Sequence, residues 1–311
     1  MEEIKPASKK IKPGKPIQTK HNKGKHTKIQ TLDVVLLVIL TIFGLAIIIP
    51  FIYVIAISFS TQQEYLKSSL LLFPKEVTFE NYKALFQDGR IWTGYRTTLL
   101  FVLLGVPLNL FLTTSMAYGL SRPDYPFKRF FIYFVVITML FSGGIVPMYL
   151  LMRDLQLINT VWSVVFNYGI NTFYLIIMMN FFRTLPLEIM ESAKIDGAGE
   201  WRIMFNIVLP ISMPIMATMT LFYAVDRWNE WFHAMIFIRD NNLVALQLAL
   251  RSIVIDSQIS QQMNASNLAT DAKFSEGMKM AAVMVTMLPI MCVFPFLQKY
   301  FVKGMTVGAI K

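Results

Sequence analysis

The sequence is poor in the residues that form disulfides, metal sites and charged soluble surfaces. Its 311 residues include one cysteine and three histidines, and only 15% of them are charged. The single cysteine, Cys292, allows no disulfide within the chain and no cysteine-based metal cluster. A soluble domain would carry about a quarter charged residues. We therefore expect neither a metal centre nor a soluble fold.

Several enzyme motifs are also absent. The sequence has no G-x-x-x-x-G-K-[ST] phosphate-binding loop, no H-E-x-x-H and no G-x-S-x-G. We predict that the chain is not an enzyme and holds no cofactor of its own. If ATP drives its work, ATP and Mg bind a separate partner subunit.

Long apolar runs dominate what is present. Apolar residues make up 55% of the chain, and they form runs near the bilayer-spanning length of about 17 to 25 residues. The runs predict an all-α membrane protein with six transmembrane helices, at about 32–58, 96–120, 130–152, 161–182, 211–238 and 278–297. We divide the chain into a disordered basic tail over 1–30, a transmembrane domain over 31–298 and a C-terminal tail over 299–311.

Basic residues set the expected orientation. Nine lysines fall within the first 28 residues. No aromatic residue there could stack on bases, so we expect no nucleic-acid partner, and contact with anionic lipid explains the charge more simply. Further basic residues lie at 122–129, at 183–202 and after 298, all on the same side of six spans. The positive-inside rule then predicts cytoplasmic termini, with outer loops at about 59–92 and 239–277.

The segment at about 184–210 is the longest ordered stretch predicted between the spans. Thr184 suits a helix N-cap, Pro186 the first turn, and Gly197 a left-handed helix stop. The pattern predicts a short helix, a glycine turn and a second short helix. Such a cytoplasmic hairpin suits docking into a groove of another protein.

Within this segment, Glu191-Ser-Ala193, Gly197 and Ile207-x-Leu209-Pro210 follow one another at a fixed spacing. This pattern resembles the EAA loop of ABC importer permeases, with Ser192 where a second alanine is usual. Further matches resemble sugar-importer permeases, the group that contains the maltose-transporter inner-membrane subunit. These are Tyr118-Gly-Leu-Ser-Arg122, Leu157-Ile-Asn-Thr160 and Trp228-Asn229. A third set resembles the branch linked to large oligosaccharides: Gly143-Gly144-x-x-Pro147, Asp196-Gly197-Ala198 and Tyr300-Phe-Val-Lys-Gly304.

The resemblance implies the type I ABC importer permease fold in a bacterial plasma membrane. It implies three protein partners: a second six-span permease subunit, a cytoplasmic ABC ATPase dimer and an extracellular substrate-binding protein. The substrate would be a carbohydrate. Coupling to the ATPase would fall to Glu191, Ser192, Ala193, Asp196, Gly197, Leu209 and Pro210. The C-terminal tail, with Lys303, Gly304 and Gly308, would reach toward the ATPase.

Two polar clusters within spans are candidates for the substrate pathway. In the fourth span, helical spacing predicts a stripe of polar residues along one face of the helix. In the fifth span, aromatic rings beside amides and carboxylates suit a polyhydroxylated ligand. The candidates are Asn167, Tyr168, Asn171, Tyr174, Asp226, Trp228, Asn229, Glu230 and Trp231. Two plainer interpretations stay open. Arg227 and Glu230 could neutralise each other, and the tryptophans, which would share a helix face, could anchor the span at the membrane surface.

The function that these features predict is carbohydrate import by alternating access, with an oligosaccharide as substrate. One alternative is a secondary sugar transporter driven by an ion gradient, but the sequence shows no inverted repeat and no isolated carboxylate in mid-span. An ABC permease for a non-sugar solute is the other alternative. The sequence does not identify the sugar.

Overall fold

The structure is a computed structural model that describes residues 31–67, 71–265 and 275–309. Every regular element in these ranges is helical. The elements are α1 (Thr31–Ser58), α2 (Gln62–Lys67), α3 (Glu80–Gln87), α4 (Gly89–Ser121), α5 (Lys128–Leu140), α6 (Ile145–Asp154), α7 (Val161–Asn167), α8 (Thr172–Phe182), α9 (Leu187–Ile195), α10 (Glu200–Ile203), the π-helical η1 (Met204–Val208), α11 (Leu209–Ile211), α12 (Met213–Trp228), α13 (Phe232–Phe237), the 3-10 turn η2 (Asn241–Leu243), α14 (Leu246–Ala265) and α15 (Ser275–Ala309). The predicted basic tail over 1–30 lies outside the described ranges.

The helices provide up to six membrane spans. α1, α4 and α15 are each long and apolar enough to cross a membrane alone. Three bent pairs pass the same test together: α5 with α6 at 111°, α7 with α8 at 53°, and α10–α11 with α12 at 87°. The all-α fold class is therefore as predicted, although half of the spans are bent.

Two compact units divide the chain, at residues 1–49 and 50–311. The described part of the first unit is the beginning of α1, a run of apolar side chains. From Leu32 to Ile49 these side chains are exposed, apart from the half-buried Gly44. Apolar residues on every face suit a helix surrounded by lipid.

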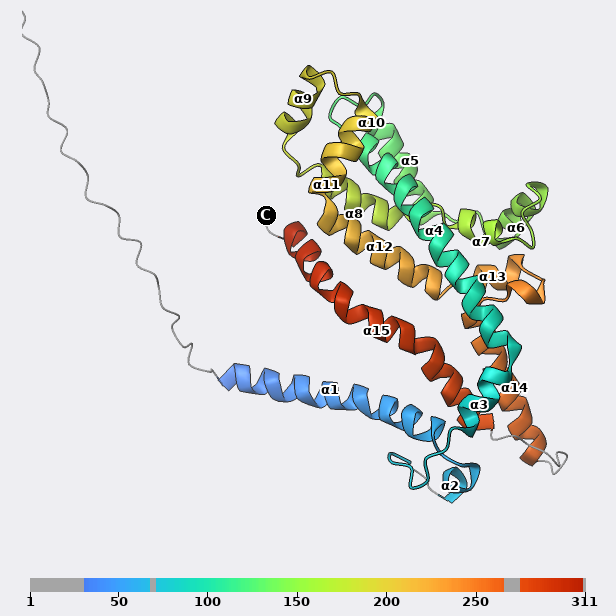
Figure 1. The fold of residues 1–311 in the computed structure, drawn as a ribbon. Coiled ribbons are helices and arrows are strands. Elements are labelled where there is room, and N and C mark those ends of the chain that lie inside the picture. The colour runs from blue at the N-terminus through green and yellow to red at the C-terminus, as the bar shows by residue number, and fades with distance from the viewer. Residues whose placement is uncertain (1–30, 68–70, 266–274, 310–311) are drawn as a thin grey trace, which may run out of the picture. The chain divides into compact units, whose positions relative to one another are not determined.

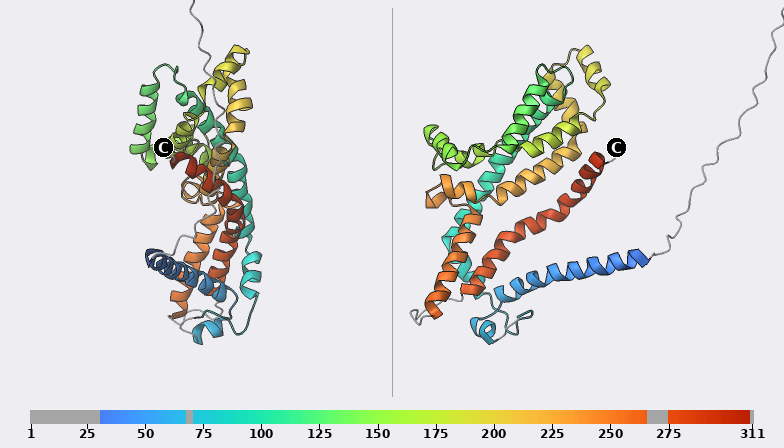
Figure 2. Two further views of the ribbon diagram at one scale, coloured as in Figure 1. Left: turned by 90° about the vertical axis from the view of Figure 1, so that its left-hand side faces the viewer. Right: turned by 180° about the vertical axis from the view of Figure 1, so that it is seen from behind.

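The second unit is built around α4, which contacts α3, α7, α8, α12 and α14 (Figure 1). Close packing on α14 requires a glycine, because a Cβ atom at Gly94 would lie 2.8 Å from the Cα atom of Leu246. Thr98 Oγ1 accepts a hydrogen bond from the Leu246 amide at 2.9 Å. α14 also lies along α15, as two further views show (Figure 2).

The helix predicted over 130–152 bends where its glycines indicate. α5 ends at Leu140, α6 begins at Ile145, and the four residues between them are not helical. Gly144 has a φ of +88°, a value that L side chains rarely adopt. The bend of this span therefore falls at the Gly143-Gly144 pair.

Two of the predicted spans are broken. The fourth span is broken at residues 168–171, between α7 and α8, and the fifth at 229–231, between α12 and α13. The apolar residues on either side of each break suggest unbroken helix. The break in the fourth span persists because Arg227 and Asn109 bind carbonyls that the missing helical turn would have satisfied.

The segment over 239–277 was expected to be an outer polar loop but contains the helix α14. Its buried apolar residues, Leu246, Ala249 and Ile253, lie on one helix face and pack toward α4 and α15. The numerous polar residues of the outward face hid this pattern. In the segment over 59–92, residues Glu80–Gln87 form the short helix α3. Its buried Asn81 amide donates to the carbonyls of Ser58 and Ser60 at 3.0 Å each.

Candidate functional site

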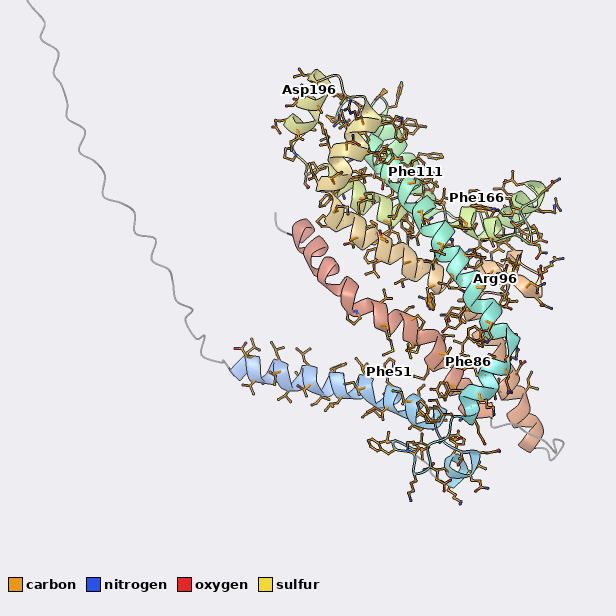
Figure 3. All side chains as sticks on the ribbon, viewed as in Figure 1. Phe51, Phe86, Arg96, Phe111, Phe166 and Asp196 are labelled. Atoms are coloured by element: carbon orange, nitrogen blue, oxygen red, sulfur yellow. The ribbon has the colours of Figure 1, made fainter. Side chains whose placement is uncertain are left out.

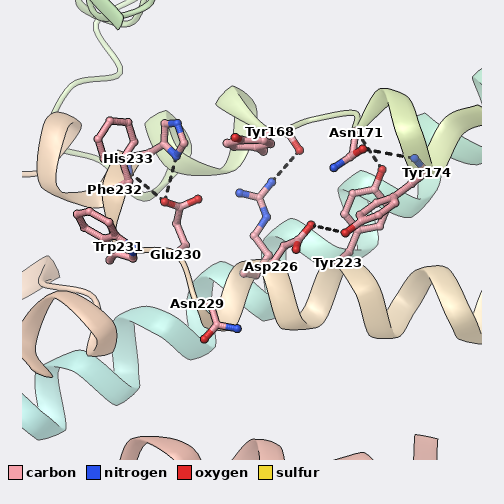
Figure 4. Close-up of a pocket in the computed structure, with 11 residues that line it drawn as sticks. Tyr168, Asn171, Tyr174, Tyr223, Asp226, Asn229, Glu230, Trp231, Phe232 and His233 are labelled. Atoms are coloured by element: carbon pink, nitrogen blue, oxygen red, sulfur yellow. Dashed lines mark hydrogen bonds and ion pairs between the residues drawn. The ribbon is translucent and has the colours of Figure 1, made fainter. Parts of the chain in front are cut away.

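A polar cavity of about 390 Å³ opens where the fourth and fifth spans are broken (Figure 4). Its lining combines aromatic rings, amides, carboxylates and one guanidinium group. The lining residues are Tyr168, Asn171, Tyr174, Tyr223, Asp226, Arg227, Asn229, Glu230, Trp231, Phe232 and His233. Seven of the nine predicted pathway residues are among them, so the folded chain does bring most of the two polar clusters together.

The guanidinium group of Arg227 connects the two broken spans. Arg227 is only 2% exposed. Its N–H groups donate to carbonyl oxygens at the end of α7 and to the side chain of Asn109 on α4. Nη1 donates to the Val164 carbonyl at 2.9 Å, and Nη2 donates to the carbonyls of Val165 and Tyr168 at 2.9 and 3.0 Å. Nε and Nη2 also donate to Asn109 Oδ1 at 3.1 and 3.0 Å. A cation therefore caps the C-terminus of α7, where the helix leaves carbonyls without partners.

Two residues of α4 make room for this group and extend its network. A Cβ atom at Gly105 would lie 2.7 Å from Arg227 Nε, so a larger residue would displace the guanidinium. The Asn109 amide nitrogen donates to the carbonyls of Tyr168 and Gly169, the latter at 2.8 Å. Neither Gly105 nor Asn109 was among the predicted site residues. An amide inside an apolar span, four residues after a glycine, was the available signal.

A second hydrogen-bond network fixes the other side of the break. Asn171 Oδ1 caps α8 by accepting from the amides of Phe173 and Tyr174 at 3.0 and 3.3 Å. The hydroxyl of Tyr174 donates to Asp226 Oδ2 at 3.0 Å. The main-chain N–H of Asn171 donates to the hydroxyl of Tyr223 at 3.2 Å. Asp226 is thus held at the cavity wall by a partner from the neighbouring span.

The residues after α12 form the third side of the cavity. Glu230 Oε1 accepts from the His233 amide at 3.0 Å and lies 3.0 Å from His233 Nδ1. The guanidinium of Arg251 lies 4.5 Å from the ring centroid of Trp231, which is 37% exposed. Mutual neutralisation of Arg227 and Glu230 was one of the interpretations left open, but Arg227 donates to α4 and α7 while Glu230 binds His233.

The two tryptophans do not share a helix face as predicted, because α12 ends at Trp228. Trp228 is 8% exposed, its ring lies against Tyr95 at 6.1 Å, and its Nε1 donates to the Thr286 carbonyl at 3.3 Å. It belongs to the packed core. Asn167 instead lines an adjoining cavity of about 510 Å³ beside Gly143 and Gly144. The predicted helical stripe fails at the break between α7 and α8.

The predicted hairpin is present as α9, a glycine turn, α10, η1 and α11. Gly197 has a φ of +78°, and the Ala198 amide donates to the Ala193 carbonyl at 2.9 Å, which closes the end of α9. Glu191, Ser192 and Asp196 are exposed. Ala193, which the resemblance assigns to coupling with the ATPase, is buried against this chain.

Beyond the turn, Leu209 is half-buried and Pro210 is exposed, both in α11. The expected C-terminal tail does not begin as a separate segment. Lys303, Gly304 and Gly308 fall within α15, whose helix continues to Ala309. Their side chains lie outside the described part of the structure. In the described ranges, no three histidine, cysteine, aspartate or glutamate side chains are grouped to hold a metal ion.

Bent spans around a polar cavity, together with an ordered hairpin between spans, define a subunit of a membrane transport system. The pattern of one family, described as binding-protein-dependent transport system inner membrane component, matches residues 109–307. The chain belongs to this family, so it is a transporter permease and not an enzyme. As part of a binding-protein-dependent ABC importer of the bacterial inner membrane, it works with an ATPase and a substrate-binding protein.

Individual proteins show the same similarity over nearly the whole chain. Protein LplC of Bacillus subtilis (strain 168) is 38% identical over 296 residues, covering 95% of this chain and 99% of that protein. The polygalacturonan/rhamnogalacturonan transport system permease protein YtcP of the same organism is 37% identical over 285 residues, covering 91% and 99%.

A solved structure supports the fold directly. It is described as a bacterial ABC transporter involved in the import of the acidic polysaccharide alginate. One of its chains superposes with a TM-score of 0.79 at 29% identity, covering 87% of this chain and 96% of that chain. The chain therefore has the type I ABC importer permease fold that its sequence motifs predicted.

The buried guanidinium gives a stability prediction. Replacing Arg227 by Met would leave several buried oxygens without a donor, at about 1–3 kcal/mol each. We expect Arg227→Met to lower the free energy of unfolding by at least about 3 kcal/mol. The exposed Arg153, which pairs with Asp154, is the control, and Arg153→Met should cost less than about 1 kcal/mol. Thermal melting of the purified protein in detergent measures both, and equal melting temperatures would contradict the prediction.

Proposed function

We propose that the chain forms, with a second six-span permease subunit, the pathway of an ATP-driven importer for an oligosaccharide. An extracellular binding protein delivers the substrate, and a cytoplasmic ABC ATPase dimer, which binds ATP and Mg, drives alternating access. The observation that carries the proposal is the cavity of about 390 Å³ at the broken spans.

The chemistry of this cavity suits a sugar. The rings of Tyr168 and Trp231 are partly exposed, 45% and 37% respectively. Sugar rings are apolar on their faces and carry hydroxyl groups around their edges. Flat aromatic groups can contact the faces, while Asp226, Asn171 and Asn229 supply carboxylate and amide groups for the hydroxyls. The volume is within the range of small-molecule sites, about 300–1,000 Å³.

The related proteins favour the same substrate class. YtcP is named for polygalacturonan and rhamnogalacturonan transport, and the matching solved structure for alginate import. A relative from Halalkalibacterium halodurans, 27% identical over 269 residues, is named for arabinooligosaccharides. Acidic and neutral sugars both occur among these names, so we infer an oligosaccharide without choosing its charge.

The hairpin offers a face for the ATPase. Ala193 and Met190 anchor α9 in this chain, which leaves Glu188, Glu191 and Asp196 exposed beside Ile195, 87% exposed. An apolar side chain ringed by carboxylates fits a hydrophobic groove with a basic rim. We assign the coupling role to this face, and a further ATPase contact to the end of α15 with Lys303, Gly304 and Gly308.

Charge supports a cytoplasmic location for this end of the protein. Five basic residues gather at this end of the protein. Two lie in the hairpin, Lys194 and Arg202. The others lie at the ends of α4 and α8 and at the start of α5: Arg122, Arg183 and Lys128. By the positive-inside rule, such a cluster faces the cytoplasm. We therefore propose that both termini are cytoplasmic as well, because six spans return the chain to the side where it began.

The energy source is the first test. We expect the complex that copurifies with this chain to import labelled galacturono- or arabino-oligosaccharides into proteoliposomes only when ATP is available to its ATPase subunits. Vanadate should block uptake and an ionophore should not. Uptake that survives vanadate and collapses with the ionophore would overturn the ATP-driven function. Uptake of neither sugar series would count against a carbohydrate and for a non-sugar solute.

The glycine turn gives a matched pair of variants. A valine at Gly197 would have to adopt a φ near +78°, which strongly disfavours β-branched residues, so we expect Gly197→Val to abolish ATP-dependent uptake. Gly199 has a φ of −71°, and neither glycine has an atom within 4 Å of an added Cβ. Gly199→Val should therefore retain uptake. Both variants should insert normally in the membrane, and full activity of Gly197→Val would refute the coupling role.

The two tryptophans separate substrate contact from packing. Trp231→Ala should raise the KM for uptake about tenfold by removing a ring of about 1.4 kcal/mol contact energy, without changing thermal stability. Trp228→Ala should instead lower the free energy of unfolding by about 3–5 kcal/mol, because Trp228 lies in the core. Uptake kinetics and thermal melting measure the two effects. An unchanged KM in Trp231→Ala would remove this ring from the proposed sugar site.

A further inference from the structure

The carboxylate of Glu200, just after the glycine turn, contacts three positively charged or hydroxyl groups. The hydroxyl of Tyr118 on α4 donates to Glu200 Oε2 at 2.5 Å. Lys194 Nζ of α9 lies 2.7 Å from Oε1, and Arg122 Nη2, directly after α4, lies 3.6 Å from Oε2. One side chain therefore joins α9 and α10 of the hairpin to the end of α4.

The next residue makes a second attachment to the same helix. The ring of Trp201 stacks on Phe111 of α4, with centroids 6.4 Å apart and planes 7° apart. Phe111 and Tyr118 are seven residues apart, so they lie on one face of α4 about 10 Å from each other. Figure 3 shows Phe111 on α4 and Asp196 at the tip of the hairpin. Two contacts separated along a helix fix the direction of the hairpin as well as its position.

The other end of this connection is the substrate cavity. Asn109, nine residues before Tyr118, lies about 14 Å away along the same unbroken helix. Its amide donates to the carbonyls of Tyr168 and Gly169, and its oxygen accepts from Arg227. A displacement of α4 along its axis therefore moves the hydrogen-bond partners of the cavity wall.

The covalent connection from the hairpin to the cavity through α12 is less direct. On its C-terminal side the hairpin ends with α11, and the segment Glu200–Ile211 meets α12 at an angle of 87°. A bend of this size lets one helix swing without displacing the next along its axis. The hydrogen bond between Glu200 and Tyr118 instead connects the hairpin to α4 near the end of that helix, with no such bend between the hairpin and the cavity.

We propose that Glu200 is a positioning residue that fastens the coupling hairpin to α4, and that α4 carries the motion of the ATPase to the cavity. The proposal rests on the coupling role proposed above for the hairpin. It assigns transmission to a helix that does not adjoin the hairpin in sequence, with Tyr118 as its point of attachment.

A cysteine reporter in the cavity tests this transmission without knowledge of the substrate. In the assembled complex, with Cys292→Ser as background, Asn229→Cys is modified by a charged methanethiosulfonate reagent. The modification rate should differ at least fivefold between nucleotide-free and ATP–vanadate states, about the lower end of allosteric coupling. Glu200→Ala should abolish the difference, while ATP hydrolysis continues. Adding Tyr118→Phe should change nothing further, because both substitutions break one connection.

Matched variants separate this role from mere stability. Tyr118, Tyr125 and Glu200 line one further cavity. Tyr125→Phe removes a hydroxyl from this cavity, but the Tyr125 ring packs on Phe131, so the nucleotide response should persist. Glu200→Gln keeps an acceptor for Tyr118 and should restore part of the response. A full response in Glu200→Ala would overturn the role of α4. If Gly197→Val also retained full uptake, the hairpin assignment itself would fail, and if it lost uptake, only the route through α4 would be wrong.

Discussion

The buried guanidinium of Arg227 is the constraint on which the second unit depends. A charged group inside a membrane protein is costly unless the protein replaces the water that it loses. Here the replacement consists of main-chain carbonyls at the end of α7 and the amide oxygen of Asn109. Gly105 provides the space. The break in the fourth span and the cation therefore require each other, because each satisfies the polar groups of the other.

This arrangement explains how irregular backbone can exist between apolar helices. Non-helical segments at membrane depth occur where they are buried in protein or line a cavity. The stretch from Tyr168 to Asn171 does both: its carbonyls face Arg227 and Asn109, while the side chains of Tyr168 and Asn171 line the cavity. The side chains that line the cavity are thus held by the same network that stabilises the fold.

Local features could be predicted from sequence. The Gly143-Gly144 bend and the hairpin with its left-handed Gly197 follow from glycine's conformational freedom, which depends on the residue itself. Features that depend on distant partners could not. α14 was mistaken for a loop because its buried face is narrow, and only α4 and α15 make it favourable. Trp228 was assigned to a sugar site because sequence does not reveal the helix end that separates it from Trp231.

The sequence by itself determined the class of protein, the membrane-spanning helices and the hairpin between them. Hydropathy and short motifs depend only on residues that are close together along the chain. Tertiary structure alone decided which polar residues meet. Asn109, Arg227 and Tyr168 come from three separate spans, and Glu200 meets Tyr118 across 82 positions of the chain. Such contacts arise because helices pack side by side, and no local pattern records which faces will touch.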